Sequence, residues 1–523
     1  MGHTDPPLPH GAGRNTIADA LHRSVSRLPD KEALIYGSRR WTFRDLDAAS
    51  NRVARALLAS GLEPGDRVGA FGRNSDAYVL LWLACSRAGL VHVPINYALG
   101  EQELEYILHQ SGAAALIHDK SLGGLVDGLR PDLGPCLRGT FREGDGLDIT
   151  AIALRQGPAE PPDIPLDDGD LAQLLYTSGT TAAPKGAMMT HRALLAEYVS
   201  CVVELDIRPG DVALAALPLY HSAQMHVFLM PGLLAGATTM LIEAPAAEEC
   251  LRLIEERRIT SFFAPPTVWI SLLRSPAFDQ RDLSSLSKAY YGASIMPVPV
   301  LQELRRRLPR VGVYNCYGQS EIGPLATVLR PEDHEERPAS AGRPVFNVET
   351  RIVDARMNDC PPGQQGEIVH RSPQLLTGYW DKPEQSAEAF AGGWFHSGDV
   401  GYFDEGGYLY IVDRIKDIIN TGGVVVSSRE VEEALFSHPA VSEVAVVALP
   451  DSKWIEAVAA MVVLRAGQDA TAEELIAHAA RHLAPFKLPK KVFFVDALPR
   501  NTAGKILKRQ LREKYSQPAN GVV

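Results

Sequence analysis

The sequence has little cysteine, and its cysteines are not spaced as a metal site would require. Six occur in 523 residues, and no two form a Cys-x-x-Cys pair, which argues against a zinc site. Most stand among apolar residues, so we interpret them as buried free thiols in a reducing cytoplasm. The six are Cys85, Cys136, Cys201, Cys250, Cys316 and Cys360.

The sequence also lacks an unbroken apolar run of the length that crosses a membrane. Pro94 and the pair Ser86-Arg87 interrupt the apolar stretch 78–99, and the stretch 227–242 is shorter than the roughly 20 residues of a span. The polar N-terminus has no apolar segment of the kind found in signal peptides. We therefore expect a cytoplasmic protein without integral membrane association.

Positive charge is in deficit. The chain has 52 Lys and Arg against 63 Asp and Glu, a formal net charge of −11, and no block of five or more like charges. Binding to nucleic acid requires clustered cations that neutralise phosphates, so we expect no nucleic-acid partner. Hydrophobic residues make up 46% of the chain. Because single cores stop growing near about 250–300 residues, we expect two or more lobes.

Helical and strand-like patterns alternate over most of the chain. Residues 43–61 have apolar positions at helical spacing, 67–71 are typical of a short strand, 76–89 of a helix and 91–95 of a strand. Alternation of this kind is typical of parallel sheets covered by helices. The same pattern predicts strands at 214–217, 238–242, 261–264 and 288–291.

The chain divides into a large and a small part. From about residue 340 to 412, short β-like runs separated by Gly and Pro predict a small β-rich subdomain within a large N-terminal domain of residues 15–415. Residues 416–514 then form a compact unit of mixed helices and strands, near the lower end of domain size. We expect the ends, 1–14 and 515–523, to be disordered tails.

A segment rich in hydroxyl groups follows the apolar run 171–175. It reads Tyr-Thr-Ser-Gly-Thr-Thr-Ala-Ala-Pro-Lys-Gly over residues 176–186. Backbone N–H groups and hydroxyls can donate to phosphate oxygens, and Lys185 adds a positive charge, so the segment could cradle a phosphate. It does not contain the pattern of a Walker A loop. Taken alone, a plain Ser/Thr/Gly surface loop would have the same composition.

This segment resembles the phosphate loop of the adenylate-forming superfamily, which includes acyl-CoA synthetases, luciferases and the adenylation domains of peptide synthetases. Further motifs follow in the family's order, from about residue 15 to 513, and the chain is most similar to the acyl-CoA synthetase branch. The resemblance implies an α/β fold, with a large N-terminal domain of stacked mixed sheets and helices and a small mobile α+β C-terminal domain. It also implies ATP, Mg²⁺ and coenzyme A as cofactors.

Residues 314–321, Tyr-Asn-Cys-Tyr-Gly-Gln-Ser-Glu, resemble the family's adenine and magnesium segment. The resemblance implies that Tyr317 stacks on adenine, that Asn315 bonds the adenine edge and that Ser320 reaches a phosphate. Glu321 would hold Mg²⁺, a hard cation that binds carboxylate and phosphate oxygens. The nucleotide-binding residues that the resemblance implies are Thr177, Ser178, Gly179, Thr180, Thr181, Lys185, Asn315, Tyr317, Gly318, Ser320, Asp399 and Arg414.

Three later segments resemble the parts of the family that hold ribose and move the small domain. Asp399 would accept both ribose hydroxyls, and Arg414 would contact ribose or phosphate. Lys416 would be the hinge, although a charged turn between domains has the same composition. Residues 499–505 resemble a catalytic loop whose Lys505 stabilises the negative charge that builds when a carboxylate attacks the α-phosphate. Catalytic roles are thereby implied for Lys505, Thr177, Lys185 and Glu321.

The acyl group would bind beside the phosphates. Residues 218–221, Pro-Leu-Tyr-His, resemble the family's acyl-pocket gate with His221 as the gate, although a lone histidine beside apolar residues is more often packed in a core. Residues 262–273 and the trio Gly292, Ala293 and Ser294 resemble the pocket walls, and simple core packing would explain them nearly as well. Because that trio is small, we expect a large lipophilic or aromatic carboxylic acid as substrate, and short acids are also compatible with the sequence.

The sequence departs from the family at several positions. Ala182 stands where the family usually has glycine, which affects the phosphate loop if that position needs φ > 0. Gly422 and Gly423 would bind coenzyme A, but residues 424–428 lack the usual Glu-Asn-x-x-Pro, and Ile455 stands where glycine is common. These last departures leave the thioester step open.

Two activities are therefore compatible with the sequence. The first is a complete acyl-CoA synthetase. The second is an adenylating enzyme that passes its acyl group to a separate thiolating enzyme or carrier protein. The intact Lys185, Glu321, Asp399 and Lys505 argue against a third, a nucleotide-binding protein with a decayed site. For the assembly we expect a homodimer.

Overall fold

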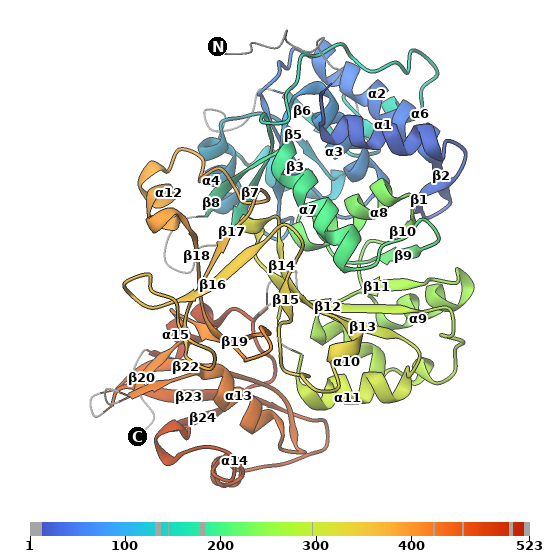
Figure 1. The fold of residues 1–523 in the computed structure, drawn as a ribbon. Coiled ribbons are helices and arrows are strands. Elements are labelled where there is room, and N and C mark those ends of the chain that lie inside the picture. Colours follow the sequence, from blue (N-terminus) through green and yellow to red (C-terminus); the bar gives the residue numbers. More distant parts are fainter. Residues whose placement is uncertain are drawn as a thin grey trace, which may run out of the picture.

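The structure is a computed structural model, and it describes residues 13–130, 137–144, 146–177, 184–294, 296–421, 424–451, 454–500 and 506–516. In this part of the chain the strands form four sheets of nine, six, four and five strands. Figure 1 shows the large sheets in the upper part of the molecule and the C-terminal sheet below them. The predicted α/β fold, with a large N-terminal part of mixed sheets and a small α+β C-terminal domain, is confirmed.

The nine-stranded sheet is parallel in its centre and antiparallel at both edges. Its strands from β13 to β1 run parallel, whereas β14, β15 and β2 pair antiparallel with their neighbours. In spatial order they are β15 (Arg343–Pro344), β14 (Leu325–Leu329), β13 (Gly312–Gly318), β12 (Lys288–Gly292), β11 (Ser261–Phe263), β9 (Val212–Ala215), β10 (Thr238–Leu241), β1 (Glu32–Tyr36) and β2 (Arg39–Thr42).

The six-stranded sheet is parallel except for β8, which forms a hairpin with β7. The spatial order is β6 (Leu137–Thr140), β5 (Ala113–His118), β3 (Arg67–Phe71), β4 (Val91–Ile95), β7 (Leu171–Thr177) and β8 (Lys185–Thr190).

Helix α3 (Asp76–Ala88) is the centre of the largest core. Ser75 caps its N-terminus, Gly89 ends it in the left-handed conformation, and all 13 of its residues are buried. A helix that is apolar around most of its circumference is stable only when it is enclosed. Its core neighbours come from both large sheets, including Val68 of β3 and Leu34 of β1. The two sheets are therefore joined by one core.

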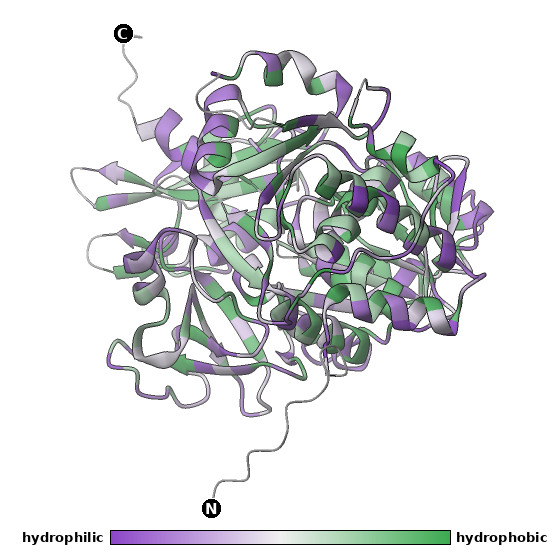
Figure 2. Cartoon of the chain, turned by 90° about the horizontal axis from the view of Figure 1, so that it is seen from above, coloured by the Kyte–Doolittle hydropathy of each residue, from purple (hydrophilic) through white to green (hydrophobic). Residues whose placement is uncertain are grey.

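The other helices lie mainly on the sheet faces, and Figure 2 shows hydrophilic residues on the outer helices and hydrophobic ones in the strands. No helix in the described ranges has the length and apolar character to cross a membrane. Besides α3, the helices of the N-terminal part are α1 (Ile17–Arg27), α2 (Phe43–Ala59), α4 (Glu101–Ser111), α5 (Gly123–Asp127), α6 (Ile149–Leu154), α7 (His191–Glu204), the π-helix η2 (Ala223–Leu229), α8 (Met230–Ala235), α9 (Ala247–Glu256), α10 (Pro266–Arg274), α11 (Val298–Arg307) and α12 (Pro383–Ala389).

The last two sheets follow in sequence. The antiparallel four-stranded sheet comprises β16 (Glu349–Val353), β17 (Gly366–Arg371), β18 (Phe395–Phe403) and β19 (Leu409–Arg414), within the predicted β-rich stretch and two residues beyond it. The C-terminal sheet has apolar side chains on both faces, and one face packs on α13 and α14, the other on α15. Its elements are β20 (Ile419–Thr421), β21 (Val424–Val426), α13 (Ser428–Phe436), β22 (Val441–Asp451), β23 (Ile455–Leu464), α14 (Ala472–Ala479), β24 (Lys491–Phe494) and α15 (Lys508–Ser516).

Several boundaries differ from the sequence predictions. The strand predicted at 214–217 begins and ends two residues earlier, because Pro218 cannot donate to a ladder and the Leu217 N–H bonds the Gln224 side chain. Residues 13–14 and 515–516, which we expected in the disordered tails, belong to the described structure. Arg14 makes a bidentate ion pair with Asp19. Tyr515, in helix α15, packs on Phe493 with ring centroids 4.6 Å apart. Residues 1–12 and 517–523 lie outside the described residues.

Candidate active site

Strands from both large sheets end at one place. Strand β7 ends at Thr177, and β12 and β13 end at Gly292 and Gly318. The Thr177 hydroxyl donates to Oε1 of Glu321 across 3.1 Å, and Glu321 lies in the short helix η4 (Ser320–Ile322) just after β13. Ligands of open α/β sheets bind outside the carboxyl ends of the strands. The junction of the two sheets is therefore the place where the predicted phosphate and metal residues meet.

Tyr379, which the sequence analysis did not single out, lies between the charged side chains of this junction. Its hydroxyl donates to Oε1 of Glu321 across 3.2 Å, and the Lys185 Nζ lies 4.9 Å from the centre of its ring. Lys185 pairs directly with Thr177 in the β7–β8 hairpin. Burial and the Glu321 charge raise the pKa of the Tyr379 phenol, so it stays a donor. Three of the four predicted catalytic residues are thus brought together.

Ser320 and its neighbours lie on the other side of Glu321. The Ser320 hydroxyl is 2.8 Å from that of Ser222, which directly follows the predicted gate residue His221. The Nε2 of Gln319 is buried and has no hydrogen-bond partner among the described residues. A buried amide without a partner is costly, and bound water or an ion is one explanation for such a group in a native structure. Gln319 is a second residue that the sequence analysis missed.

The residues predicted to bind ribose form a separate part of the site. The Tyr317 hydroxyl donates to Oδ2 of Asp399 across 2.7 Å, and the Arg414 Nε lies 3.3 Å from Oδ1 of the same carboxylate. Burial and the Asp399 charge raise the pKa of the Tyr317 phenol. The Asn315 amide instead donates to the Ser340 carbonyl across 2.8 Å. Tyr317, Asp399 and Arg414 therefore meet, whereas the amide N–H of Asn315 is held by the backbone.

A buried network lies behind the turn that carries Ser320 and Glu321. Glu197 of α7 is fully buried and accepts from the Leu325 N–H at 2.9 Å and from Nε2 of Gln374 at 2.5 Å. Nε2 of Gln374 also donates to the carbonyls of Ile322 and Leu325 at 2.9 and 2.8 Å. Burial raises the pKa of Glu197 to about 8. The one indication of this network in the sequence is Glu197 itself, a glutamate among the apolar positions of helix α7.

The predicted acyl-pocket walls are arranged around β12. A Cβ on Gly292 would lie 2.3 Å from the Cys316 carbonyl oxygen, so β12 and β13 can approach only because this residue is glycine. Ala293 follows with φ +63°, in the left-handed region. Within 262–273, Phe262 packs on Trp269 in a different core from that of Phe263. Only part of the range 262–273 therefore lies on the same face of the sheet as Gly292.

The hinge position lies in a tight turn. The Arg414 carbonyl accepts from the Asp417 and Ile418 N–H groups at 2.9 and 3.1 Å, which places the exposed Lys416 at the tip between β19 and β20. The remaining predicted site residues, Ser178, Gly179, Thr180, Thr181, Gly422, Gly423 and Lys505, lie outside the described residues, as does Ala182.

Glu321 is the metal ligand that the sequence predicts, and it stands apart from other metal-binding side chains. No cluster of three or more His, Cys, Asp or Glu that could hold a metal was found within the described ranges. A single carboxylate does not make a zinc site. It fits Mg²⁺, which keeps several waters and binds through one or two carboxylates plus substrate phosphates.

Comparison with known proteins gives consistent matches over both lobes. The AMP-binding enzyme family matches residues 21–380, and the AMP-binding enzyme C-terminal domain matches residues 430–505. A feruloyl-CoA synthase of Amycolatopsis sp is 38% identical over 94% of this chain and 98% of its own length. A long-chain-fatty-acid–CoA ligase of Mycobacterium tuberculosis is 35% identical over 91% and 93%.

A solved structure extends this likeness to the fold. The anthranilate CoA ligase AuaEII in complex with anthranoyl-AMP aligns with a TM-score of 0.89 at 29% identity, over 97% of this chain and 98% of that chain.

Proposed function

Because this chain belongs to the AMP-binding enzyme family and is an AMP-forming acid–CoA ligase, we propose that it activates a large aromatic or lipophilic carboxylic acid with ATP and transfers the acyl group to coenzyme A. Relatives named for ferulate and for long-chain fatty acids support an acid of one of these two classes. Transfer to a separate thiolating enzyme or carrier protein is the second activity compatible with the sequence. Separate measurement of the two steps distinguishes it from ligation to coenzyme A.

One observation supports this assignment most strongly. Thr177 and Lys185 from one sheet and Glu321, just after β13 of the other, meet around the Tyr379 ring. A hydroxyl, an ammonium group and a carboxylate suit a polyphosphate with its cation. Asp399, held by Tyr317 and Arg414, is 5% exposed and offers a carboxylate for a sugar diol.

In the first step, a carboxylate oxygen of the acid attacks the α-phosphorus of ATP. A new P–O bond forms, the bond to the β-phosphate oxygen breaks, and pyrophosphate leaves. Catalysis of such a transfer is mainly positioning and stabilisation of charge. Lys185, the hydroxyls of Thr177 and Ser320, and Lys505 supply donors for that charge. Mg²⁺ bound at Glu321 would neutralise phosphate charge.

In the second step, the thiol of coenzyme A attacks the acyl carbon. The C–S bond forms, the bond from the acyl carbon to the AMP oxygen breaks, AMP leaves, and the thiol proton passes to solvent. We place the pivot between the two steps at Lys416, because it is the exposed tip of the turn that joins β19 to β20. Hinges of this kind are a few residues that absorb a large dihedral change. Gly422 and Gly423 would then face the thiol.

The two steps can be tested separately with ferulate as the acid. We expect acid-dependent release of pyrophosphate, followed by formation of feruloyl-CoA when coenzyme A is added. Lys505→Ala should lower the first step by about 100-fold or more, the loss typical of one transition-state donor, and should leave ATP binding intact. A matched control is Lys382→Ala, a lysine of the N-terminal part.

The outcomes separate the two activities. Release of pyrophosphate without any thioester would replace the ligase by an enzyme that serves a separate acceptor. Near-normal pyrophosphate release from Lys505→Ala would overturn the role of that lysine.

A further inference from the structure

We propose that Phe228 closes the inner end of the acyl pocket and restricts this enzyme to compact acids, such as an aromatic ring with a short side chain, over long-chain fatty acids. The inference rests on the proposed function, because it takes the acyl group to lie against Gly292. It goes beyond that function by choosing between the two acid classes.

The strands beneath the site carry aromatic side chains in one row. Phe263 of β11 pairs with Tyr290 of β12, and Tyr290 pairs with Tyr314 of β13. Residues two apart on a strand share a face, so Gly292 and its partner Cys316 stand on the same face as this row, one step nearer the carboxyl ends. At about 3.3 Å per residue that step is about 7 Å. An acyl group that lies over Gly292 therefore meets these aromatic side chains about 7 Å deeper, at a depth of about one aromatic ring.

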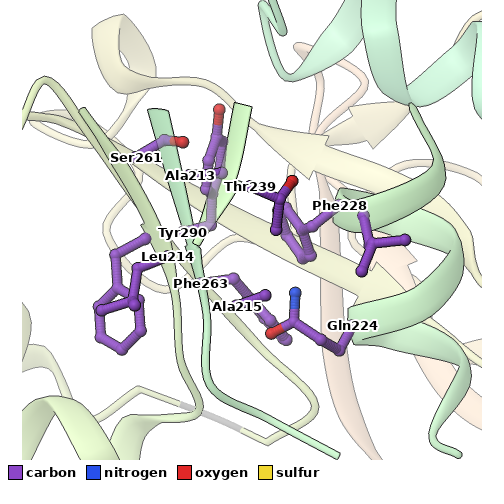
Figure 3. A pocket seen from close by; sticks show the side chains of 11 residues that line it. Ala213, Leu214, Ala215, Gln224, Phe228, Thr239, Ser261, Phe263 and Tyr290 are labelled. Carbon is purple, nitrogen blue, oxygen red and sulfur yellow. The ribbon is translucent and has the colours of Figure 1, made fainter. Parts of the chain in front are cut away.

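Phe228 completes the floor from the opposite side. It comes from the π-helix η2, which begins directly after His221 and Ser222, and it stacks on Phe263 with ring centroids 4.3 Å apart and an interplanar angle of 18°. Its ring also lies 5.0 Å from that of Tyr290. Figure 3 draws the small pocket behind this floor, with Phe228 on its helix side, opposite Phe263 and Tyr290 on the strands.

The aromatic floor is fixed in place. The Tyr290 hydroxyl donates to the Leu205 carbonyl across 2.7 Å, and Phe228, Phe263 and Tyr290 are all buried. Stacked aromatic pairs contribute about 0.5–1.5 kcal/mol beyond their burial. A flexible acyl chain would have to break these contacts to pass.

The space behind the floor is small. A pocket of about 10 Å³ lies there, which is room for about one water molecule. Its wall includes the small side chains of Ala213, Ala215 and Thr239, and the Thr239 hydroxyl has no partner among the described residues. Because these side chains are small, removal of the Phe228 ring would join this pocket to the space above it. The same fold could then take a longer acid.

The test compares acids of increasing length in three forms of the enzyme. Acid-dependent pyrophosphate release is measured for ferulate and for saturated acids from butyrate to palmitate, with the native protein, Phe228→Ala and the milder Phe228→Leu. We expect the native enzyme to prefer ferulate to palmitate by about tenfold or more in kcat/KM, since even one methylene in a pocket changes this ratio by about 10–200-fold. Both variants should move the preferred chain length upward.

A matched control separates pocket length from loss of stability. Phe278 is as well buried as Phe228, at 4% against 8% exposed, but it belongs to the core on the other face of the sheet. Phe278→Ala should lower the unfolding temperature and leave the length profile unchanged. An equal preference for palmitate in the native enzyme, or an unchanged profile in Phe228→Ala and Phe228→Leu, would overturn this inference alone. No pyrophosphate release with any acid would overturn the proposed function as well.

Discussion

Tyr379 joins the two charged side chains of the phosphate site. Its ring lies beneath the Lys185 ammonium group and its hydroxyl donates to Glu321, so one side chain positions both. It is 58 residues from Glu321 in sequence, on a segment whose backbone pairs with β8 through the Trp380 N–H and the Gly186 carbonyl. Such a role depends on a tertiary contact, which explains why no local pattern indicated it.

Tyr379→Phe separates these two functions, because it keeps the ring and removes the hydroxyl. We expect the rate of adenylation to fall about tenfold, the equivalent of about 1.4 kcal/mol, since hydrogen bonds to charged groups contribute about 1.5–3 kcal/mol. The Mg²⁺ concentration for half-maximal rate should rise, because Glu321 loses one of its donors. Tyr402→Phe, at a tyrosine stacked on Tyr410 in the small sheet, is the control. An unchanged Mg²⁺ dependence in Tyr379→Phe would contradict the positioning role.

Glu197 makes stability depend on pH in a predictable direction. Burial raises its pKa from 4.5 to about 8, so the folded state binds a proton that the unfolded state releases between those values. The stabilisation is complete below pH 4.5 and is lost as the pH rises toward 8. We expect the free energy of unfolding of the native protein to fall, relative to that of Glu197→Gln, by a few kcal/mol over this range, at about 1.4 kcal/mol per pKa unit.

Denaturant unfolding from pH 5 to 8.5 measures this difference. Glu248→Gln, at an exposed glutamate of α9, gives the control. Parallel pH profiles for the native protein and Glu197→Gln would contradict the assignment.

Helix α13 is attached to the strand that precedes the proposed hinge. Asp413 of β19 accepts from the Ser428 N–H at 2.6 Å and from the Ser428 hydroxyl at 2.8 Å, at the positive end of the helix. Lys508 of α15 donates to the same hydroxyl at 2.7 Å and pairs with Glu432 at 2.8 Å. These bonds connect β19, which precedes Lys416, with α13 and α15, which follow it.

Asp413→Ala removes this helix attachment. We expect the free energy of unfolding to fall by about 1–2 kcal/mol, as for loss of an N-cap, because Asp413 likewise accepts from an N–H group of the first turn of α13. The loss should be seen as faster proteolysis between the large and small parts of the chain. Asp469→Ala, at an exposed aspartate beyond β23, should leave the cleavage rate unchanged. Equal cleavage of the two variants would show that Asp413 does not hold α13.

The elements themselves were largely predictable from the sequence. The helix predicted at 76–89 forms as α3, and the strands predicted at 67–71 and 91–95 form with those bounds, because apolar spacing and the stop at Gly89 are local signals. The order of the strands was not predictable. The contact between Thr177 and Glu321 joins two sheets across 144 residues, so their meeting came from the family resemblance and not from any pattern in the residues.

The large part of the molecule is held together by a buried polar network between its elements. The Gln173 side chain of β7 lies 2.8 Å from Nε2 of His226 in η2 and 3.1 Å from Nδ1 of His92 in β4. The Tyr198 hydroxyl of α7 lies 2.8 Å from Nδ1 of His226. Burial lowers the pKa of both histidines to about 3. The network connects the strand that ends at the phosphate site with the helix that ends the acyl pocket.

This network should make the molecule sensitive to acid. Both folded pKa values are below the usual 6.5, so the unfolded state binds more protons and stability is lost as the pH falls from 6.5 toward 3. His226→Gln should lose less stability over that range than the native protein, by up to a few kcal/mol. Unfolding by denaturant at pH 7 and pH 5 checks this, with His22→Gln, an exposed histidine of α1, as control. An equal loss in both variants would contradict it.

The central claim is that this molecule joins the acid to the α-phosphate of ATP before it forms the thioester. The most direct test follows the oxygen atoms of the acid during complete turnover with ATP and coenzyme A. If the acid carries a heavy oxygen isotope in its carboxylate, attack on the α-phosphorus predicts one labelled oxygen in the AMP released and none in pyrophosphate. Label in inorganic phosphate, with ADP as the other product, would contradict the account.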